Sequence, residues 1–315
     1  MKYFFLGWIA EYEQVMIKNL SLRHKIETIS TPKITKRLNR YISKINKLFN
    51  KNLISNEWLA RNLLSSYSVS NSDILICNDW QFKRDFQPTI IKNFKGKKVL
   101  LVRNLIDLDF MLSIKGVFDK VYSFDKPQCE LYGMDYLNQF FPYGVDDVKS
   151  LHSRIEESTG APKCFFLGRD KGRTAAIKSI AKQLRGLCCV ADFYIVKDKN
   201  TKYFSEYHVD EGFSYDKSIE MSTSSNFLLD IPQDGQAGIT LRALESIFFN
   251  KKLITSNNEI KLQPFFRPEN IHIIGKDNFN DLCEFIQSKS TVLPEEILHQ
   301  FSPDHMLKKI TADMK

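Results

Sequence analysis

Metal-binding and disulfide patterns are missing from this sequence of 315 residues. It has only six cysteines, none of them in a Cys-x-x-Cys pair, and its six histidines lie singly along the chain. Cys77 and Cys164 fall inside apolar stretches typical of strands, which favours reduced thiols in a core. The sequence therefore predicts neither a structural zinc nor a disulfide-stapled secreted fold, and it is typical of a cytosolic protein.

Long uncharged apolar runs are missing as well. Hydrophobic residues make up 43% of the chain, enough for substantial cores, yet no stretch reaches the roughly eighteen apolar residues of a membrane-spanning helix. The first ten residues lack the basic leader and the cleavage site of a secretory signal. We therefore expect a cytoplasmic protein that is long enough for two domains of ordinary size.

Short apolar stretches alternate with amphipathic ones along the whole chain, and no internal repeat interrupts them. This alternation predicts an α/β protein with mostly parallel sheets covered on both faces. The predicted strands are 3–6, 25–29, 74–77, 98–102, 120–123, 165–167, 188–196, 227–231, 252–255 and 271–274. The predicted helices are chiefly 13–21, 35–64 with a break near Asn50, 107–114, 175–184 and 240–249. Residues 140–147, with a proline and a glycine, are the best candidate for a linker between two domains.

The most informative segment is 226–257. Its pattern predicts a buried strand, a polar loop with two glycines, an amphipathic helix and a second strand. Gly238 would let the backbone approach a ligand closely, and Thr240 is placed to cap the helix. The free N–H groups at such a helix start favour an anion, most naturally a phosphate.

Two charged residues follow in the first turns of that helix. Arg242 and Glu245 lie three residues apart and so share one face. An arginine beside a phosphate and a carboxylate beside ribose hydroxyls would hold a nucleotide diphosphate. Gln236, in the preceding loop, belongs to the same set of candidate binding residues.

A second strand–turn–helix corner indicates the same kind of ligand. The apolar strand at 164–167 is followed by Gly168 and by three cations, Arg169, Lys171 and Arg173, before the next helix. Arginine can hold phosphate oxygens in a bidentate way. The glycine spacing matches neither the dinucleotide fingerprint nor the P-loop, and a solvated basic turn is the competing interpretation. Two such corners in one domain favour a nucleotide.

These two segments carry a family resemblance. Residues 235–257, with Glu245 in a helix that ends in Asn250-Lys-Lys-Leu-Ile-Thr-Ser-Asn, resemble the donor-binding segment of GT-B glycosyltransferases. Residues 165–174 are similar to the first strand and basic loop of the same domain in that family. Two positions depart from the family pattern. Asn250 stands where a glycine is usual, and Glu245 is the only evident member of the acidic pair found in many retaining members.

The resemblance implies a GT-B fold, with two Rossmann-like domains whose mostly parallel sheets face a central cleft. An acceptor-binding domain at 1–143 and a nucleotide-sugar-binding domain at 144–293 are expected, with 294–315 packing back on the first. The opening residues, 1–13, resemble the lipopolysaccharide-core rhamnosyltransferase group. The implied activity is transfer of a sugar, best matched by dTDP-rhamnose, to a lipid-linked lipopolysaccharide core or related surface glycan.

No cofactor or metal is expected beside the nucleotide-sugar substrate. The negative charge of the leaving group can be offset by the basic corner at 168–173 and by the helix start at Thr240. Asp107 and Asp109 imitate a metal-binding Asp-x-Asp motif, but they open a helix, so capping explains them better. A non-catalytic sugar-nucleotide or glycan-binding protein on the same fold is the alternative, since a fold does not determine a function.

A catalytic base is expected in the first domain, at the carboxyl ends of its strands. An inverting transfer needs a carboxylate or histidine to take the proton of the acceptor hydroxyl. Glu11 after the first strand and Asp79 after the third are the candidates. Glu11 is equally well explained as an acidic residue at a helix start, and Asp125 as a cap. His208 is interpreted as a surface histidine.

Positive charge is concentrated in residues 33–52, which hold seven Lys or Arg and no acid in a chain of net charge +8. Apolar residues recur at helical spacing on the other face: Ile34, Leu38, Ile42, Ile45 and Phe49. Such a helix can lie on an anionic membrane, here the inner face of the cytoplasmic membrane, or it can pack on its own sheet with a solvated basic face. Nucleic acid is not expected, because aromatic residues are not interleaved with this basic run.

Overall fold

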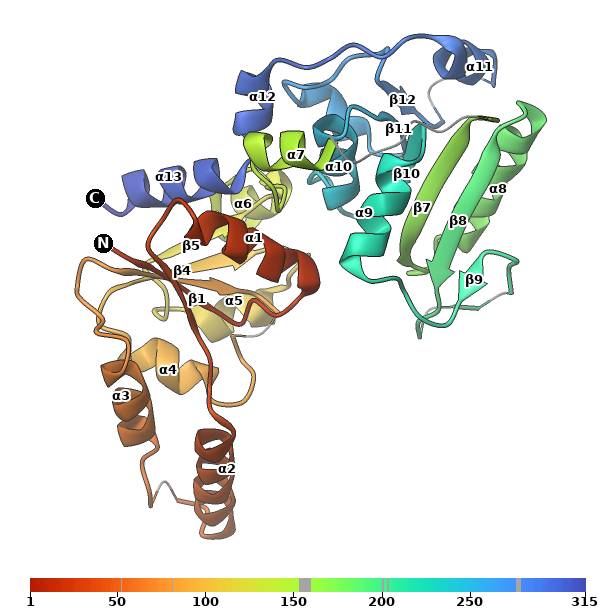
Figure 1. Ribbon diagram of the computed structural model, residues 1–315. Helices are drawn as coiled ribbons and strands as arrows, with labels where there is room; N and C mark the ends of the chain where they lie inside the picture. The colour runs from red at the N-terminus through yellow and green to blue at the C-terminus, as the bar shows by residue number, and fades with distance from the viewer. Residues whose placement is uncertain (52, 81, 153–159, 200, 203, 276–278) are drawn as a thin grey trace. The chain divides into compact units, whose positions relative to one another are not determined.

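The computed structural model describes residues 1–315 except 52, 81, 153–159, 200, 203 and 276–278. The chain forms two compact units (Figure 1). The first consists of residues 1–137 and 310–315, and the second of residues 138–309. No helix in the described part of the chain combines the length and the apolar character needed to cross a membrane.

The first unit is built on a six-stranded sheet in which all neighbouring strands are parallel. Its strand order is β2-β1-β3-β4-β5-β6. The strands are β1 (Tyr3–Leu6), β2 (Ile26–Ile29), β3 (Ile74–Asn78), β4 (Lys97–Val102), β5 (Lys120–Ser123) and β6 (Asp135–Tyr136). Strands β1 and β3 are buried along their whole length, as expected for apolar stretches covered on both faces.

Helices cover both faces of this sheet (Figure 1). The helices of the unit are α1 (Glu11–Ser21), α2 (Lys33–Leu48), α3 (Glu57–Ser65), α4 (Gln87–Asn93), α5 (Leu108–Ile114) and α6 (Lys126–Tyr132), of which α2 extends away from the sheet. On one face, Phe4 and Leu75 of the sheet belong to a buried core together with Leu59 of α3. Ile90 of α4 and Ile114 of α5 extend that core. Helix α1 lies on the other face and buries Met16, Ile17 and Leu20.

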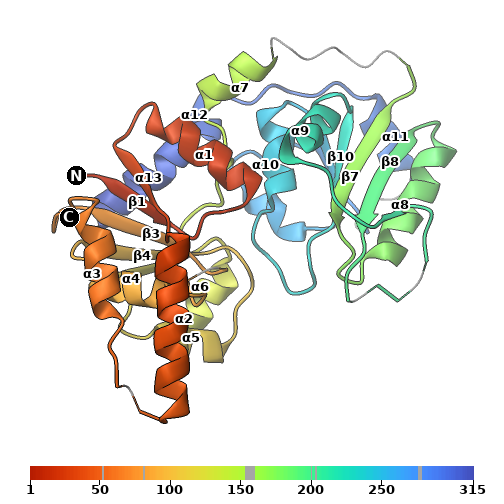
Figure 2. The same ribbon diagram turned by 60° about the horizontal axis from the view of Figure 1, so that its bottom comes forward.

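The end of the chain belongs to the first unit. Helix α13 (Pro303–Asp313) ends there, and its last residues bond to the sheet. The hydroxyls of Tyr3 and Thr311 are 2.5 Å apart, and the Tyr122 hydroxyl donates to Asp313 at 2.8 Å. Figure 2 shows both chain termini at this unit.

The second unit contains a second six-stranded sheet, again with all neighbouring strands parallel. Its strand order is β12-β11-β10-β7-β8-β9. The strands are β7 (Lys163–Arg169), β8 (Val190–Val196), β9 (His208–Val209), β10 (Phe227–Asp230), β11 (Lys252–Thr255) and β12 (Ile271–Ile273). The parallel order explains why the strands of both units read as apolar runs rather than as alternating patterns.

Helices also cover both faces of the second sheet. The helices of this unit are α7 (Val145–His152), α8 (Thr174–Gly186), α9 (Tyr215–Thr223), α10 (Leu241–Phe248), η1 (Asn258–Leu262), α11 (Phe279–Gln287) and α12 (Glu295–His299). On one face Ile177 of α8 and Leu282 of α11 belong to a buried core with Phe166 of the sheet. Helices α9 and α10 lie on the opposite face (Figure 1).

All ten predicted strands are present, and their ends agree with the prediction to within two residues. The pattern missed β6 and β9, which are two residues long and lie at sheet edges, too short to carry a periodic signal. The predicted helix at 35–64 is two helices, α2 and α3. Asn50, where the break was predicted, has a left-handed backbone with a φ of 52°.

The division between the units falls after Leu137, whereas the sequence pattern placed a linker at 140–147. Phe141 is fully buried within the second unit. Its ring lies 4.7 Å from that of Phe248 and 5.4 Å from that of Phe249. The proline and glycine of this segment therefore mark a turn inside the unit, a feature that sequence punctuation does not distinguish from a linker.

Candidate functional site

Each unit has a pair of neighbouring parallel strands whose following connections lead to opposite sides of the sheet. In the second unit the pair is β7 and β10, because β7 leads through α8 to β8 and β10 leads through α10 to β11 on the other side. In the first unit the pair is β1 and β3. Ligands of open α/β sheets bind outside the carboxyl ends of such strands.

The two phosphate-binding corners predicted from sequence lie on one of these pairs. Strand β7 ends at Arg169 and β10 ends at Asp230, and the two strands are paired in register through Cys164 and Phe227. Helix α8 begins after a short turn, at Thr174, and α10 begins after a longer loop, at Leu241. Segments more than fifty residues apart in sequence thus lie side by side at the carboxyl ends of two neighbouring central strands.

Thr240 caps α10 as predicted. Its hydroxyl oxygen accepts from the backbone N–H of Ala243 at 3.1 Å and donates to Asp230 at 2.9 Å. The hydroxyl of Thr255, at the end of β11, donates to the other oxygen of Asp230 at 3.1 Å. Burial raises the pKa of Asp230, and the two hydroxyls with the nearby arginines oppose that rise. Asp230 was not singled out from sequence, although an acidic residue ending an apolar strand is a readable signal.

Arg242 and Glu245 form a buried ion pair. The Arg242 guanidinium donates to Glu245, to the hydroxyl of Ser222 at 2.7 Å and to the Leu167 carbonyl at 3.3 Å. Ser222 in turn donates to Glu245 at 3.0 Å, and the guanidinium lies 4.9 Å from the centre of the Phe165 ring. Burial raises the pKa of Glu245, whereas Arg242 and Ser222 lower it. The two predicted ligand contacts therefore bond to each other.

The asparagine that replaces a family glycine has a physical explanation. Asn250 follows α10 with a left-handed backbone, at a φ of 50°. Asparagine adopts this conformation more readily than other residues that have a side chain, and it ends helices for that reason. The departure at Asn250 therefore preserves the turn into β11.

Arg173 holds the protein backbone at the corner. Its guanidinium donates to the carbonyls of Arg169 and Ile231 and, at 3.2 Å, to that of Asp170. It also lies 5.6 Å from the centre of the Phe166 ring. Burial lowers the pKa of Arg173, while neighbouring carboxylates raise it. Arg173 thus ties the ends of β7 and β10 together, a structural role that its sequence position did not reveal.

The other two cations of this corner are exposed. Lys171 has a φ of 45° and precedes Gly172 at 80°, so the chain turns sharply in the left-handed region. The Lys171 ammonium donates to Gln233 at 2.9 Å, and its backbone N–H donates to Asp198 at 3.0 Å. Arg169 and Lys171 are therefore held over the edge of the sheet with their charges accessible.

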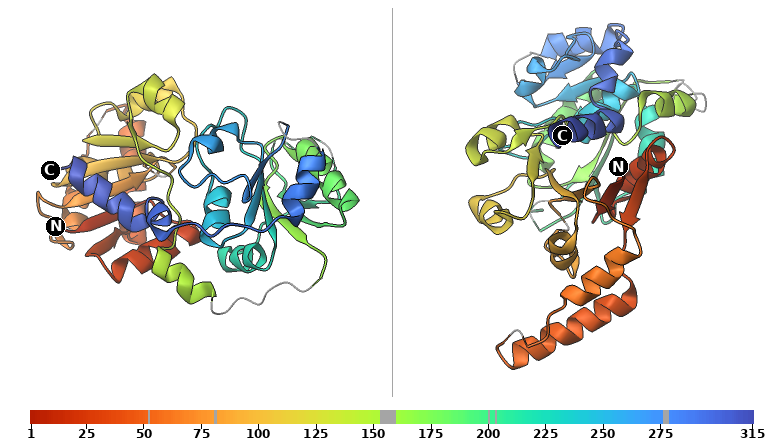
Figure 3. Two further views of the ribbon diagram at one scale, coloured as in Figure 1. Left: turned by 90° about the horizontal axis from the view of Figure 1, so that it is seen from above. Right: turned by 90° about the vertical axis from the view of Figure 1, so that its left-hand side faces the viewer.

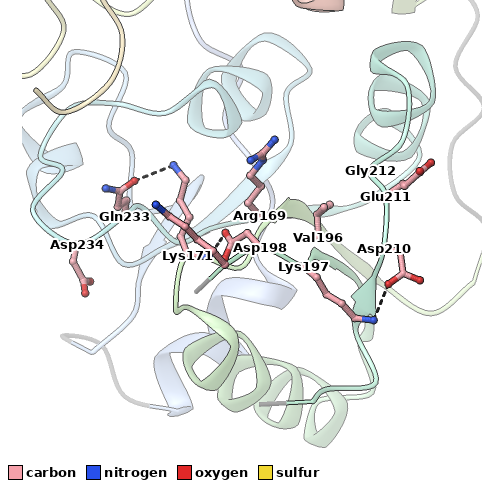
Figure 4. A pocket seen from close by; sticks show the side chains of 11 residues that line it. Arg169, Lys171, Val196, Lys197, Asp198, Asp210, Glu211, Gly212, Gln233 and Asp234 are labelled. Carbon is pink, nitrogen blue, oxygen red and sulfur yellow. Dashed lines mark hydrogen bonds and ion pairs between the residues drawn. The ribbon is translucent and has the colours of Figure 1, made fainter. Parts of the chain in front are cut away.

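A pocket of about 910 Å3 opens beside these two cations (Figure 4). Its lining is Arg169, Lys171, Val196, Lys197, Asp198, Lys199, Asp210, Glu211, Gly212, Gln233 and Asp234. Figure 4 shows Arg169 and Lys171 apart from Asp210 and Glu211, with Lys197 bonded to Asp210 at 2.8 Å. The pocket thus offers cations for an anion and carboxylates for hydroxyl groups.

The remaining predicted binding residues are Gln236 and Gly238, in the loop before α10, and Gly168 in β7. Gln236 donates to the carbonyl of Gly238 at 3.3 Å, so both belong to the loop that leads to Thr240. Gly168 lies within β7, where an added Cβ would stand 3.2 Å from the Arg173 guanidinium. None of these residues is among those described as lining the pocket, and their contact with a ligand stays a prediction.

The side chain of His208 is buried, which corrects its interpretation as a surface histidine. Its Nδ1 accepts from the backbone N–H of Ser205 at 3.0 Å. Its Nε2 lies 3.4 Å from Asp170 and 3.2 Å from the Thr174 hydroxyl. Asp170 also accepts from the backbone and hydroxyl of Thr174, at 3.2 and 2.7 Å. This network fixes β9 against the start of α8.

At the carboxyl ends of β1 and β3 in the first unit, Glu13 rather than Glu11 is the buried carboxylate. Glu11 is the exposed first residue of α1. Glu13 accepts from the backbone N–H of Ala10 at 3.0 Å and from Asn78 at 3.2 Å. Arg103 lies 3.7 Å from it. The pattern missed Glu13 because both acids open the same helix and only tertiary contacts separate them.

Asp79 follows β3 and is half-buried. One of its carboxylate oxygens accepts from both the backbone N–H and the side-chain amide of Asn104, at 3.0 and 3.1 Å. Burial raises the pKa of Asp79, while Asn104 and Arg103 lower it. A carboxylate whose pKa is raised towards neutrality is better matched to accepting a proton from a hydroxyl.

An exposed aromatic residue adjoins Asp79. Trp80 is 60% exposed, and the Arg84 guanidinium lies 4.4 Å from the centre of its ring. Exposed tryptophan at the carboxyl end of a central strand offers an apolar face for a sugar ring. A lone tryptophan within a polar stretch was not singled out from sequence, although large exposed aromatic residues are a usual feature of binding surfaces.

Two predicted caps are confirmed. Asp107 accepts from the backbone N–H of Phe110 at 2.8 Å at the start of α5, and Asp125 accepts from that of Gln128 at 3.2 Å at the start of α6. Within the described ranges, no group of three or more His, Cys, Asp or Glu side chains is arranged to hold a metal ion.

Comparison with known proteins shows a likeness of fold. No family model and no curated protein sequence matches the chain. Among solved structures, a sucrose-phosphate synthase from Thermosynechococcus elongatus matches with a TM-score of 0.54 and 10% identity, over 99% of this chain and 98% of that one. A UDP-forming trehalose-phosphate synthase from Burkholderia xenovorans matches with a TM-score of 0.54 and 7% identity, over 100% and 99%.

A glycosyltransferase of avilamycin A biosynthesis matches with a TM-score of 0.53 and 8% identity, over 100% of this chain and 96% of that one. At these identities the likeness concerns the fold alone. The fold is the GT-B fold of glycosyltransferases, with a parallel six-stranded sheet in each of two α/β units. The predicted fold class is confirmed.

Proposed function

We propose that this protein is a glycosyltransferase that uses a nucleotide-diphosphate sugar as donor. The observation that carries the proposal is the arrangement of residues at the carboxyl ends of β7 and β10. Two corners predicted separately to bind phosphate lie there on neighbouring strands, beside a pocket with two accessible cations, Arg169 and Lys171. The GT-B fold supports the same class of activity, because its structural neighbours carry the names of sugar transferases and sugar-phosphate synthases.

The roles of the two units follow from this assignment. We assign donor binding to the second unit and acceptor binding to the first. The donor's diphosphate lies beside Arg169 and Lys171, and its sugar hydroxyls donate to the carboxylates of Asp210 and Glu211. The cations offset the charge of the departing nucleoside diphosphate, so the proposed transfer requires no metal.

The resemblance of the chain's opening residues favours a particular substrate pair. We propose dTDP-rhamnose or a similar donor, and a lipopolysaccharide core or related lipid-linked surface glycan as acceptor. Trp80 provides a stacking face for a sugar ring of that acceptor. The proposed cellular place is the cytoplasm, with peripheral contact at the inner face of the cytoplasmic membrane.

The proposed chemistry is a single displacement with a carboxylate base. The acceptor hydroxyl gives its proton to the base while its oxygen attacks the anomeric carbon of the donor sugar. The bond from that carbon to the diphosphate breaks, and the nucleoside diphosphate leaves with the electron pair. Asp79 and Glu11 are the candidate bases, and the burial and raised pKa of Asp79 favour Asp79.

A ligand screen separates this function from its alternative. Sugar nucleotides that bind the native state should raise the melting temperature, and the best of them is then incubated with the protein in the absence of acceptor. A transferase is expected to release the nucleoside diphosphate slowly by transfer to water. Binding without any hydrolysis would instead support the second candidate, a non-catalytic sugar-nucleotide-binding protein on the same fold.

Arg169→Ala and Lys171→Ala are each expected to weaken donor binding without lowering stability. Both side chains are exposed, and loss of one charge-assisted bond to phosphate costs about 1.5–3 kcal/mol. Calorimetric titration with the best nucleotide from the screen measures the change. Lys182→Ala, an exposed cation near the end of α8, is the matched control. Affinities equal to wild type in both pocket variants would contradict the donor site.

Arg173→Ala is expected to lower stability. Its guanidinium bonds three backbone carbonyls at the ends of β7 and β10, and the variant leaves these carbonyls without that donor. The carbonyls of Asp170 and Ile231 are partly buried, and a buried group left unsatisfied costs about 1–3 kcal/mol. Urea unfolding measures the loss, with Arg169→Ala as the comparison. A stability equal to wild type, together with lost nucleotide affinity, would mean that Arg173 contacts the ligand directly.

A further inference from the structure

Helix α2 has two neighbouring surfaces of opposite character. It carries six Lys or Arg and no acidic residue. At about 100° per residue, the six cations fall within one arc of about 100°. The next arc holds only apolar and aromatic residues, which are Leu48, Tyr41, Ile34, Ile45, Leu38, Phe49 and Ile42 in order around the helix.

A third, narrow face attaches α2 to its own unit. Asn39 and Ile42 are the buried residues of the helix. Asn39 accepts from the side chain of Asn56 at 2.8 Å. Asn46 exchanges two hydrogen bonds with the backbone of Ile54, at 2.9 and 3.0 Å. The contacts that hold α2 in place thus use Ile42 and polar amides, and they leave most of the apolar arc outside.

The apolar arc is exposed. Ile34 is 71% exposed, Tyr41 65% and Leu48 81%, against 8% for Ile42. Two apolar residues after the helix, Leu53 and Trp58, are also more than half exposed. Figures 1 and 3 show α2 extending away from the sheet of its own unit. A helix that needed its apolar arc only for the core would have it buried.

The charge of the helix decides what covers this surface. A second copy docked through the apolar arc would bring two rows of cations near each other, with no acid on either helix to pair with them. A nucleic acid would use the cations and leave the apolar arc in water. An anionic lipid surface satisfies both arcs at once, because acyl chains take the apolar residues and headgroup phosphates take the cations.

We propose that α2, together with the exposed side chains of Phe49, Leu53 and Trp58, forms an interfacial anchor for anionic phospholipid. The helix lies in the plane of the membrane surface, with the apolar arc among the upper acyl chains and the cationic arc among the headgroups. A helix that lies in this plane with one arc in the acyl chains and the other among the headgroups attaches the protein peripherally. The anchor stands on the helix alone and does not depend on the proposed transferase activity.

Vesicle sedimentation with the full-length protein tests the anchor. Wild type is expected to sediment with vesicles of phosphatidylcholine and phosphatidylglycerol at low salt, and much less with phosphatidylcholine alone or at high salt. Two sets of substitutions divide the contributions. The charge variant changes Lys36, Arg37, Arg40 and Lys44 to Gln. The apolar variant changes Ile34 to Asn, Tyr41 to Ser and Leu48 to Asn.

Each variant is expected to lower the partition coefficient on anionic vesicles by roughly 100-fold or more, since each cation near the surface and each buried apolar side chain contributes about 1 kcal/mol or more. A charge-matched control changes Lys18, Lys182, Lys261 and Lys289, exposed cations elsewhere, to Gln and should bind nearly as well as wild type. Because all substituted side chains of the helix are at least partly exposed, melting temperatures should stay close to wild type.

Four results would overturn the anchor. Wild type remaining in the supernatant with anionic vesicles at low salt excludes it. An apolar variant that binds as wild type does would show attraction by charge alone, without insertion. Equal loss in the charge-matched control would show a diffuse effect of net charge. Self-association that the apolar variant abolishes, without vesicle binding by wild type, would assign the surface to a second copy of the chain.

Discussion

Asp79→Asn is expected to lower turnover by roughly 100-fold or more while donor affinity and stability stay near wild type. The asparagine keeps the shape and can still accept the hydrogen bonds from Asn104, but it cannot take the proton of the acceptor hydroxyl. Burial already raises the pKa of Asp79, so replacing the carboxylate by a neutral amide should cost the fold little. Steady-state kinetics with calorimetry of donor binding separate the two effects.

Glu11→Gln and Glu13→Gln are the controls for this result. Glu11 is exposed, and Glu11→Gln should leave turnover within a few-fold of wild type if Asp79 is the base. Glu13 is buried, and its change should act mainly on stability. Because the pKa of Asp79 is raised, activity should fall on the acid side at a pH above that of an ordinary aspartate. Collapse with Glu11→Gln alone would assign the base to Glu11.

Arg242→Met is expected to destabilise the protein by about 3–5 kcal/mol. The change leaves Glu245 buried without its ion-pair partner, and an uncompensated buried charge is among the costliest defects in a fold. Urea unfolding of the full-length protein measures the loss of stability. The double variant Arg242→Met with Glu245→Gln removes the charge as well and should recover a large part of it.

The pH dependence of the single variant follows from the same carboxylate. Burial raises the pKa of Glu245 in the folded state, and loss of Arg242 removes the first of the influences that lower it. A folded pKa above the unfolded value gives stability that is lost as pH rises, so the deficit should be largest near neutral pH and smaller near about pH 5. A deficit that does not change with pH would mean that lost packing on Phe165, rather than the charge of Glu245, causes the instability.

Local patterns determined most of the secondary structure. Buried parallel strands appear as short apolar runs, and helix starts carry their own caps, so Thr240, Asp107 and Asp125 could be assigned their places from sequence. The alternation of strands and helices determined the fold class, because connections between parallel strands must cross a face of the sheet. The break between α2 and α3 could also be predicted, because Asn50, where it was placed, adopts the left-handed backbone that ends helices.

The partners of the charged side chains depend on tertiary contacts and could not be predicted from local sequence. Arg169, Lys171 and Arg173 look alike in sequence, yet Arg173 bonds backbone carbonyls while the other two remain exposed. Glu11 and Glu13 open one helix, and only contact with Asn78 of β3 selects Glu13 for burial.

By itself, then, the sequence determined the order of elements, the caps and the two glycine-containing corners, since these depend on neighbours a few residues away. Only the tertiary structure decided that the corners lie on adjacent strands, that Arg242 pairs with Glu245, and that the apolar arc of α2 is exposed. The physical reason is that burial and charge pairing depend on groups brought together by the sheet order. That order places β10 beside β7 although four other elements, α8, β8, β9 and α9, lie between them along the chain.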